Sequence, residues 1–300
     1  MRWFPLILPE RDEELLSQGI LFQIMKALKI LAFAKLNLVL RVVGRREDGY
    51  HLLQSLFCAV DLADEIILEA IPWEVELLAP SDLGPPQQDL AYRAAQALLG
   101  SAGPGVRIHL RKRIPVGAGL GGGSSDAAAV LAGLNFIFEL GKTVDELREL
   151  GAKLGADVPF FLGKSPAWVE GIGDRIFPAE VPIPEAFLLV VPPFRCPTAL
   201  VYKIFDELGL PFSVPGPIPR VPPFPNDLWP AATSLHPKLL QLRRALEDIP
   251  SLGVGMSGSG PTLFLAFSSA EEAEAARQRI RLPAEVLIAR PVDCGYKIVG

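Results

Sequence analysis

Five glycines and two serines lie directly before a strongly apolar segment of the chain, a combination that can bind phosphate. The run consists of Pro115, Val116, Gly117, Ala118, Gly119, Leu120, Gly121, Gly122, Gly123, Ser124 and Ser125. Glycines permit positive φ angles and let the backbone approach a ligand closely. The free N–H groups at the start of a following helix carry a partial positive charge. The run therefore predicts a nucleotide-phosphate site, and the two serines are expected to cap the helix.

Two common phosphate-binding motifs share part of this spacing. Gly117, Gly119 and Gly122 match the Gly-x-Gly-x-x-Gly motif of dinucleotide-binding folds. Such a fold also needs a second strand that ends in an acidic residue about 20 residues later. Here we expect a second helix at that place, so the motif does not fit. A Walker A loop needs lysine where Gly123 stands. A plain strand-to-helix turn needs only one or two glycines, and each further one costs up to about 1 kcal/mol relative to alanine. A helix-terminus phosphate site is the favoured interpretation.

Other polar residues have more than one explanation when they are taken by themselves. Lys35 and Asn37 lie two apart in an alternating segment, so they share the polar face of an expected strand. Lys35 could be a solvated lysine, and Asn37 a polar edge residue. Asp157 precedes Pro159 at an element boundary, where a carboxylate can face a substrate or simply cap a helix.

Three aromatic side chains differ in how well a place in the core would explain them. Tyr50 and His51 follow Gly49 in a polar turn, where an aromatic ring is less often part of a core. Tyr202 has the spacing of ordinary helix core. Taken by themselves, Tyr50 and His51 are thus less easily explained as core residues than Tyr202.

Composition narrows the class of protein. The 300 residues are 50% hydrophobic and 21% charged, with a net charge of -5, so nothing global favours nucleic acid or an anionic membrane as a partner. No apolar run has the length of a membrane span. The three cysteines are widely spaced and form no Cys-x-x-Cys pair, which argues against disulfides and zinc and fits a reducing cytoplasm.

Periodicity predicts a sheet-rich first part under a layer of helices. Alternating apolar residues indicate strands over 30–43, 52–60, 65–70 and 106–110. Helices are expected from a cap at Asp89 to Leu99, directly after the glycine run, and from a capping box at Thr143 to Gly155. We expect a first domain over residues 25–165.

The pattern restarts in an expected second domain over residues 166–300. It predicts strands over 187–191 and 262–267, helices over 198–208 and 235–246, a glycine loop over 253–260, and a helix capped by Ser269. The segment 211–225 holds seven prolines and cannot be regular structure. Residues 1–24 form an extension without an export signal, and Met25 could be the true start. Neither segment receives a function.

The glycine run resembles the ATP loop of the GHMP small-molecule kinases, which bind phosphate at a helix N-terminus without a Walker A motif. Further blocks, in the expected order, resemble the members of this family that act on cytidylated methylerythritol. These blocks are 34–38, 46–51, 154–160, 226–228 and 256–261, and the resemblance covers residues 29 to 300. Phe33 and Ala118 depart from it, since the family usually has proline and glycine there.

The resemblance implies roles for individual residues. It makes Asp157 the base that takes the proton of the acceptor hydroxyl, and Lys35 its catalytic partner. Asn37 would contact the substrate, while Tyr50 stacks on cytidine and His51 hydrogen-bonds to it. Tyr202 would close the cytosine sandwich from the other side. ATP is the implied cofactor, together with Mg²⁺, for which no Asp/Glu cluster announces ligands.

The resemblance also implies a fold and an activity. The fold is α+β with two domains: a β-rich N-terminal α/β domain whose helix layer crosses left over right, and a ferredoxin-like C-terminal domain. The activity is ATP-dependent phosphorylation of the 2-hydroxyl of 4-diphosphocytidyl-2-C-methyl-D-erythritol in non-mevalonate isoprenoid synthesis. Another GHMP kinase, acting on mevalonate or homoserine, is the alternative. A non-catalytic RNA-binding module is a more distant one, disfavoured by the acidic composition.

Overall fold

The computed structural model describes residues 27–80, 83–100 and 103–299. The expectations for residues 1–24 and for Met25 lie outside these ranges.

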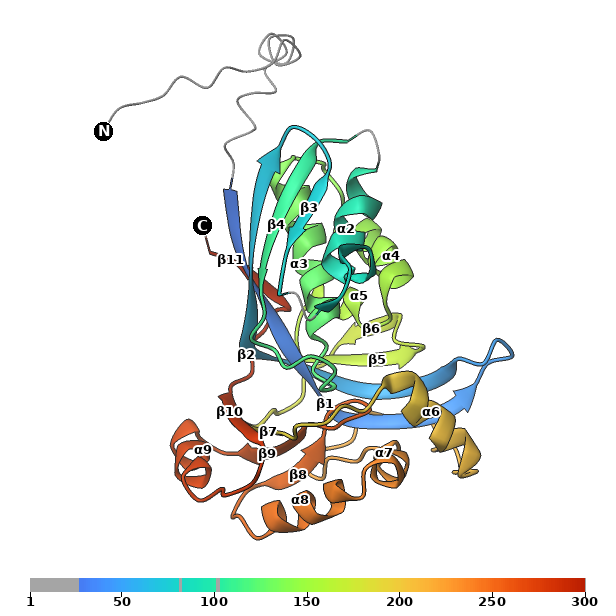
Figure 1. The fold of residues 1–300 in the computed structure, drawn as a ribbon. Helices are drawn as coiled ribbons and strands as arrows, with labels where there is room; N and C mark the ends of the chain where they lie inside the picture. Colours follow the sequence, from blue (N-terminus) through green and yellow to red (C-terminus); the bar gives the residue numbers. More distant parts are fainter. Residues whose placement is uncertain (1–26, 81–82, 101–102, 300) are drawn as a thin grey trace, which may run out of the picture.

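Two β-sheets lie one above the other, each with its own helices (Figure 1). The first sheet contains β1 (Ala27–Arg45), β2 (His51–Ile71), β3 (Val75–Leu78), β4 (Gly105–Arg111), β5 (Ala167–Gly171), β6 (Arg175–Pro178) and β11 (Tyr296–Ile298). The second contains β7 (Ala186–Val191), β8 (Gly253–Met256), β9 (Leu263–Phe267) and β10 (Glu285–Ala289). Their orders are β11-β1-β2-β4-β3, with β5 and β6 attached to β2, and β10-β7-β9-β8.

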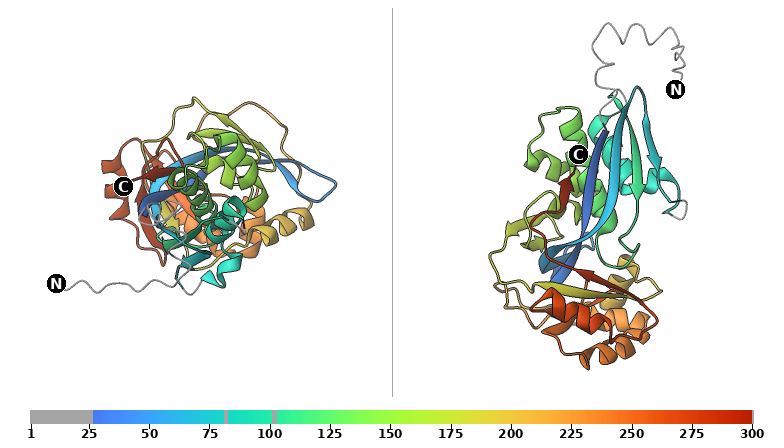
Figure 2. Two further views of the ribbon diagram at one scale, coloured as in Figure 1. Left: turned by 90° about the horizontal axis from the view of Figure 1, so that it is seen from above. Right: turned by 90° about the vertical axis from the view of Figure 1, so that its left-hand side faces the viewer.

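The helices divide between the two sheets in the same way (Figures 1 and 2). The helices of the first part are α2 (Leu90–Leu99), α3 (Gly122–Ile137), α4 (Val144–Leu154) and α5 (Val158–Phe161), and a 3₁₀ turn, η3 (Pro86–Gln88), precedes α2. Helices α2 and α3 pack on the first sheet, and α4 and α5 pack against α3. The second part contains α6 (Thr198–Glu207), α7 (Trp229–Leu235), α8 (Lys238–Glu247) and α9 (Ala270–Arg277). The second sheet has its strands in the order fourth, first, third, second, with helices after the first and third, which is the ferredoxin-like arrangement.

Three of the predicted helix caps are confirmed. The Asp89 side chain accepts a hydrogen bond from Ala91 N at the start of α2, and Thr143 with Glu146 forms a complete capping box on α4. Ser269 caps α9 through Glu272 N. These short polar side chains satisfy backbone N–H groups that would otherwise lack partners, which is why the sequence marks the helix starts.

Strand β1 runs through all three hydrophobic clusters of the residues that the structure describes. Its N-terminal third contributes Leu28 and Ile30 to the cluster under α3. Its middle contributes Leu36 to a cluster between the sheets, and its end contributes Leu40 and Val42 to the cluster of the second part. Figure 1 shows β1 and β2 bending at the waist of the molecule and ending in a hairpin beside α6. The two sheets therefore share one long strand pair.

Irregular pairing explains this bend and corrects one expectation. Strand β2 is a single strand over His51–Ile71, where two strands were predicted, because a register shift between Phe33 and Ala34 accommodates the polar residues around Asp61. A second shift lies between Asn37 and Val39. Lys35 therefore lies between two bulges, where a strand can turn its side chains toward a site.

Two elements of the second part differ from the expectation. The helix predicted over 235–246 is α8, which starts only at Lys238 because the ring of Pro237 fixes its N-terminus. The separate helix α7, which ends at Leu235, was not predicted. The first four residues of the expected glycine loop form β8, which pairs with β9 although it carries two glycines. Short strands with little side-chain surface give a weak periodic signal.

The proline-rich segment 211–225 contains no helix or strand, as predicted, and it lies along β1. Leu40 N donates to Pro225 O at 2.9 Å, and Ser213 N donates to Val42 O at 2.8 Å. Within the described residues, no strand pairs with these backbone groups at the end of β1. The proline-rich segment provides their hydrogen-bond partners instead.

The boundary between residues 165 and 166 stays a prediction. Strands β5, β6 and β11 follow it in sequence and pair in the first sheet. Among the residues that the structure describes, no helix combines the length and the apolar character needed to cross a bilayer.

Gly133 lets α3 pack closely on the first sheet, and its replacement tests that contact. A Cβ at this position would lie 2.4 Å from Ile30 Cδ1 and 2.6 Å from Leu68 Cδ1. We expect Gly133→Ala to lower the free energy of unfolding by about 1–3 kcal/mol through overpacking, although alanine favours helix more. Urea unfolding measures the change. Gly123→Ala on the same helix, where the nearest contact is an ordinary 3.6 Å, is the control and should not destabilise the fold. An unchanged midpoint for Gly133→Ala would contradict this packing.

Candidate active site

The glycine run forms a tight loop that only glycine can build at several positions. Gly117, Gly119 and Gly121 have φ angles of 70°, 78° and 73°. A Cβ on Gly119 would lie 2.3 Å from Ser257 O, and one on Gly121 would lie 2.9 Å from the Phe161 ring. Ala118 replaces the usual family glycine without strain, since it is not among the positive-φ residues and is buried.

Neighbouring segments hold this loop on both sides. Lys35 N donates to Leu120 O at 2.9 Å, which attaches the loop to β1. The Ser257 hydroxyl donates to Gly119 O at 2.8 Å, which attaches it to the glycine segment after β8. That segment is tied in turn to Asn226, whose amide donates to Met256 O and Gly258 O at 2.8 and 2.9 Å. Three of the sequence blocks thus meet at the loop.

The prediction that Ser124 and Ser125 cap α3 is wrong. The N-cap is Gly121 in the left-handed conformation, and no side chain caps this end in the structure. Ser124 is the third residue of the helix and lines the adjacent pocket. Ser125 is fully buried one residue later, and its hydroxyl has no hydrogen-bond partner in the structure. A glycine N-cap leaves the first N–H groups of α3 without side-chain acceptors, as an anion site requires.

Lys35 and Asp157 form an ion pair beside this helix terminus. Lys35 Nζ lies 3.7 Å from Asp157 Oδ2, with the lysine side chain 4% exposed and the aspartate 32% exposed. Burial lowers the pKa of Lys35, and the carboxylate of Asp157 partly offsets this shift. Asp157 starts α5, but its side chain makes no capping hydrogen bond. The carboxylate is thereby free to face the pocket.

Asn37 connects this lysine to the sheet. Lys35 Nζ donates to Asn37 Oδ1, and Asn37 Nδ2 donates to the hydroxyl of Ser55 on β2 at 2.9 Å. The lysine ammonium also lies 5.0 Å from the centroid of the Phe57 ring. Sequence reasoning missed Ser55, because a serine in a strand has no distinguishing pattern.

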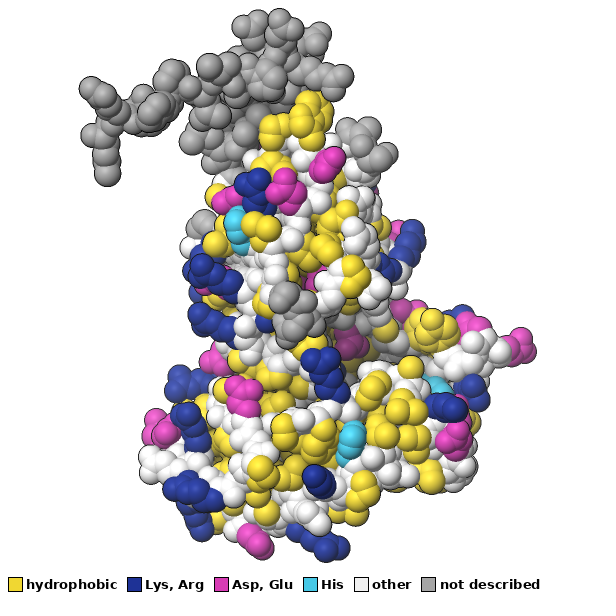
Figure 3. Space-filling view, in the orientation of Figure 1, with side chains coloured by type: hydrophobic (Ala, Val, Ile, Leu, Met, Phe, Trp, Pro, Cys, Tyr) yellow, Lys and Arg dark blue, Asp and Glu magenta, His cyan; other side chains and the backbone are white. Residues whose placement is uncertain are grey.

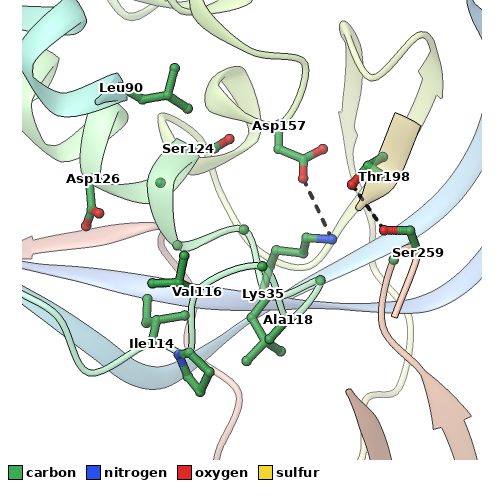
Figure 4. Close-up of a pocket in the computed structure, with 18 of the residues that line it drawn as sticks. Lys35, Leu90, Ile114, Val116, Ala118, Ser124, Asp126, Asp157, Thr198 and Ser259 are labelled. Atoms are coloured by element: carbon green, nitrogen blue, oxygen red, sulfur yellow. Dashed lines mark hydrogen bonds and ion pairs between the residues drawn. The ribbon is translucent and has the colours of Figure 1, made fainter. Parts of the chain in front are cut away.

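These groups line one cavity of about 450 Å³ at the waist of the molecule, where the surface recedes between the two parts (Figure 3). Figure 4 shows Asp157 directed at the Lys35 ammonium near Ser124, with Thr198 and Ser259 across from them. The predicted site residues in its lining are Lys35, Asn37, Pro115, Val116, Gly117, Ala118, Gly119, Leu120, Gly121, Gly122, Gly123, Ser124, Asp157 and Tyr202. Ser125, Tyr50 and His51 are not in it.

The three aromatic candidates lie on the hairpin and α6. Tyr50 is 62% exposed at the hairpin turn. The His51 ring stacks on Tyr202, with centroids 4.7 Å apart and planes at 26°. Burial, together with nearby Asp157, raises the pKa of the Tyr202 phenol. The structure thus brings His51 and Tyr202 together and leaves Tyr50 in solvent.

A buried charged cluster at the other end of the cavity escaped sequence reasoning. Lys112 Nζ lies 2.5 Å from Asp64 Oδ2 and 2.6 Å from Asp126 Oδ2. Burial lowers the pKa of Lys112. The carboxylates of Asp126 and Asp64 have a larger combined effect in the opposite direction, so the pKa of Lys112 is raised. Burial raises the pKa of Asp126 well above its usual value, with Lys112 opposing. Asp64 also accepts from Ile114 N at 2.9 Å, so it fixes the start of the glycine run.

Comparison with known proteins identifies the family of the chain. The family described as GHMP kinases N terminal domain matches residues 89–164, and that described as GHMP kinases C terminal matches 225–284. A Syntrophus aciditrophicus (strain SB) protein named 4-diphosphocytidyl-2-C-methyl-D-erythritol kinase is 39% identical over 280 residues, 89% of this chain and 100% of the relative. One of the same name from Syntrophotalea carbinolica is 43% identical, covering 83% of this chain and 93% of the relative. The chain belongs to the 4-diphosphocytidyl-2-C-methyl-D-erythritol kinase family.

Solved structures agree with this family. The crystal structure of a 4-(cytidine 5'-diphospho)-2C-methyl-D-erythritol kinase has a TM-score of 0.74 at 37% identity and covers 88% of this chain and 98% of its own. A homoserine kinase from Cytophaga hutchinsonii has a TM-score of 0.67 at only 18% identity, covering 91% and 97%. The second likeness shows a shared fold alone. The resemblance to GHMP kinases and the α+β fold predicted from the sequence are confirmed.

Removing Asp64 tests the buried cluster. Its side chain is fully buried, so Asp64→Ala would leave backbone N–H groups and part of the Lys112 charge without a partner. We expect the free energy of unfolding to fall by about 3–5 kcal/mol, measured by urea unfolding. The control is Asp145→Ala, because Asp145 is 86% exposed in a surface ion pair with Arg148, which contributes about 0–1 kcal/mol. Equal, small losses for both variants would contradict a stabilising role for Asp64.

Proposed function

We propose that this chain transfers the γ-phosphoryl group of ATP to the 2-hydroxyl of 4-diphosphocytidyl-2-C-methyl-D-erythritol, in non-mevalonate isoprenoid synthesis. The observation that carries the proposal is the Lys35–Asp157 pair, which shares one cavity with the glycine loop and the N-terminus of α3. A phosphate cradle beside a carboxylate and an ammonium is the set of groups that phosphoryl transfer to an alcohol needs. The names of the relatives supply the substrate.

Asp157 is the proposed base. Its carboxylate, partly exposed to the cavity, takes the proton from the 2-hydroxyl as that oxygen attacks the γ-phosphorus. Lys35 stays close enough to hold the carboxylate in place and to stabilise negative charge on the attacking oxygen. Because Asn37 accepts a hydrogen bond from Lys35 Nζ and is itself tied to Ser55, the ammonium is fixed by both neighbours. The transfer is direct, without a phosphoenzyme.

The glycine loop is the proposed triphosphate site, from Pro115 to Ser125. The first N–H groups of α3 supply donors for phosphate oxygens, and the glycines allow the close approach. The phosphate charge of bound ATP would be partly neutralised by a magnesium ion. The hydroxyl of Ser124 offers an oxygen ligand within the cavity lining, which fits an ion that takes few protein ligands and keeps several waters.

The cytidine end is proposed to bind at the hairpin and α6. Tyr202 lines the cavity and carries His51 against its ring, and exposed Tyr50 lies one residue before His51. Tyr50 would stack on the base, and Tyr202 would flank it from the other side. In this proposal the enzyme works in the cytoplasm, where the described thiols of Cys58, Cys196 and Cys294 stay free.

The substrate can be tested with a panel of alcohols. We expect ATP consumption with the cytidylated methylerythritol and not with mevalonate or homoserine, because only the first has a base for the aromatic site. Coupled measurement of ADP release reports turnover, and melting temperatures report binding, since a ligand that binds only the folded state raises Tm. Turnover of mevalonate or homoserine alone would assign the chain to a different reaction.

Asp157→Asn tests the base. The amide keeps the size of the side chain but cannot take a proton, so we expect kcat to fall by about 10²- to 10⁴-fold. ATP affinity, measured by calorimetry, should change little. Asp145→Asn, an exposed aspartate on α4, is the control and should retain full activity. Undiminished kcat in Asp157→Asn would rule out Asp157 as the base.

A further inference from the structure

His51 is held by contacts on three sides, although its position in the sequence suggests an open turn. Its side chain is only 7% exposed. Tyr202 stacks on one face, and the Phe205 ring meets it edge-on at 5.9 Å. The third contact is polar, since His51 Nε2 lies 2.8 Å from Asp206 Oδ1.

The carboxylate of Asp206 is fixed in turn. Its second oxygen, Oδ2, lies 3.2 Å from the guanidinium of Arg45, the residue that pairs with His51 across the β1–β2 hairpin. Asp206 and Tyr202 are four residues apart on α6, so they lie on the same face of the helix. One helix therefore supplies both the ring that stacks on His51 and the carboxylate that binds its edge.

This contact determines which ring nitrogen carries the proton. A carboxylate oxygen can only accept, so Nε2 of a neutral His51 is the donor and Nδ1 carries the lone pair. No residue described in the structure hydrogen-bonds to Nδ1. With Nε2 occupied, Nδ1 is the polar atom of the neutral ring without a partner among the described residues, and it can only accept.

We propose that Asp206 is a positioning residue that sets the preference for cytosine over uracil by fixing the tautomer of His51. This inference rests on the proposed function, in which His51 hydrogen-bonds to the base. The exocyclic amine of cytosine is a donor and suits a bare Nδ1. Uracil carries a carbonyl oxygen at that position, which would face the Nδ1 lone pair. Discrimination of this kind is strong because the mismatched base leaves a polar atom without a partner.

The kinetic test compares cytidylated and uridylated methylerythritol as substrates. In Asp206→Asn the amide can donate as well as accept, so His51 can adopt either tautomer. We expect KM for the cytidylated substrate to rise about tenfold and the cytidine-to-uridine ratio of kcat/KM to fall by a similar factor. kcat with the cytidylated substrate and KM for ATP should stay near the wild-type values. Glu207→Gln, on the same helix with an exposed carboxylate, is the matched control and should behave as wild type.

A second measurement needs no variant. ¹⁵N NMR of histidine side chains distinguishes the two tautomers, and the chain has only three histidines, so a His51→Gln spectrum assigns the signal. We expect the Nε2–H tautomer for His51 in the wild type and a mixture in Asp206→Asn. An Nδ1–H tautomer in the wild type would overturn the inference.

The kinetic outcomes separate this inference from the proposed function. A wild-type enzyme that phosphorylates neither substrate overturns the proposed function and the inference with it. If the wild type is active but Asp206→Asn keeps the wild-type cytidine-to-uridine ratio, only the inference fails. An equal loss on both substrates together with a raised KM for ATP means that Asp206 serves the fold alone, and this too overturns it.

Discussion

A buried ammonium must have oxygen partners, and this requirement organises the centre of the molecule. Lys35 lies under the glycine loop with almost no access to water, where an isolated charge would be strongly unfavourable. Asp157 and Asn37 provide its oxygens, and they arrive on different elements. The positions of β1 and α5 are therefore coupled at one charged atom, while the loop is attached to the backbone N of the same residue. In the proposed function, the same charged atom stabilises negative charge on the attacking oxygen.

Backbone irregularity allows these partners to meet. Regular pairing along β1 would continue the alternation of side chains without interruption, but register shifts on both sides of Lys35 change the direction of the strand. Next to it, left-handed glycines bring the loop within contact of the strand, and Ser257 holds the loop from the second part of the molecule. The site is thus assembled from places where regular structure is interrupted.

Much of the fold could be predicted from the sequence, because its signals are local. Helix caps such as Thr143 and strand alternation in β1 depend on neighbouring residues, and both were correct. The errors arose where distant residues decide. Ser125 has the composition of a cap but is buried, and β8 is short and glycine-rich.

The candidate site shows the same division. Lys35 and Asp157 were predicted from sequence motifs. No motif marks Asp64, because its importance comes from its contact with Lys112, which lies 48 residues further along the chain. Asp206 was missed for a similar reason. A carboxylate on an amphipathic helix is ordinary in sequence, and only the hairpin that folds against it reveals its contact with His51.

The shared strand has a consequence for how the protein folds. Because β1 supplies side chains to all three hydrophobic clusters, neither half can complete its core before the other has placed that strand. The two halves of the molecule are therefore not independent folding units. Cutting the chain between them would separate the second half from a strand that forms part of its own interior, so the cleft between the halves is maintained by cooperative folding of the whole chain.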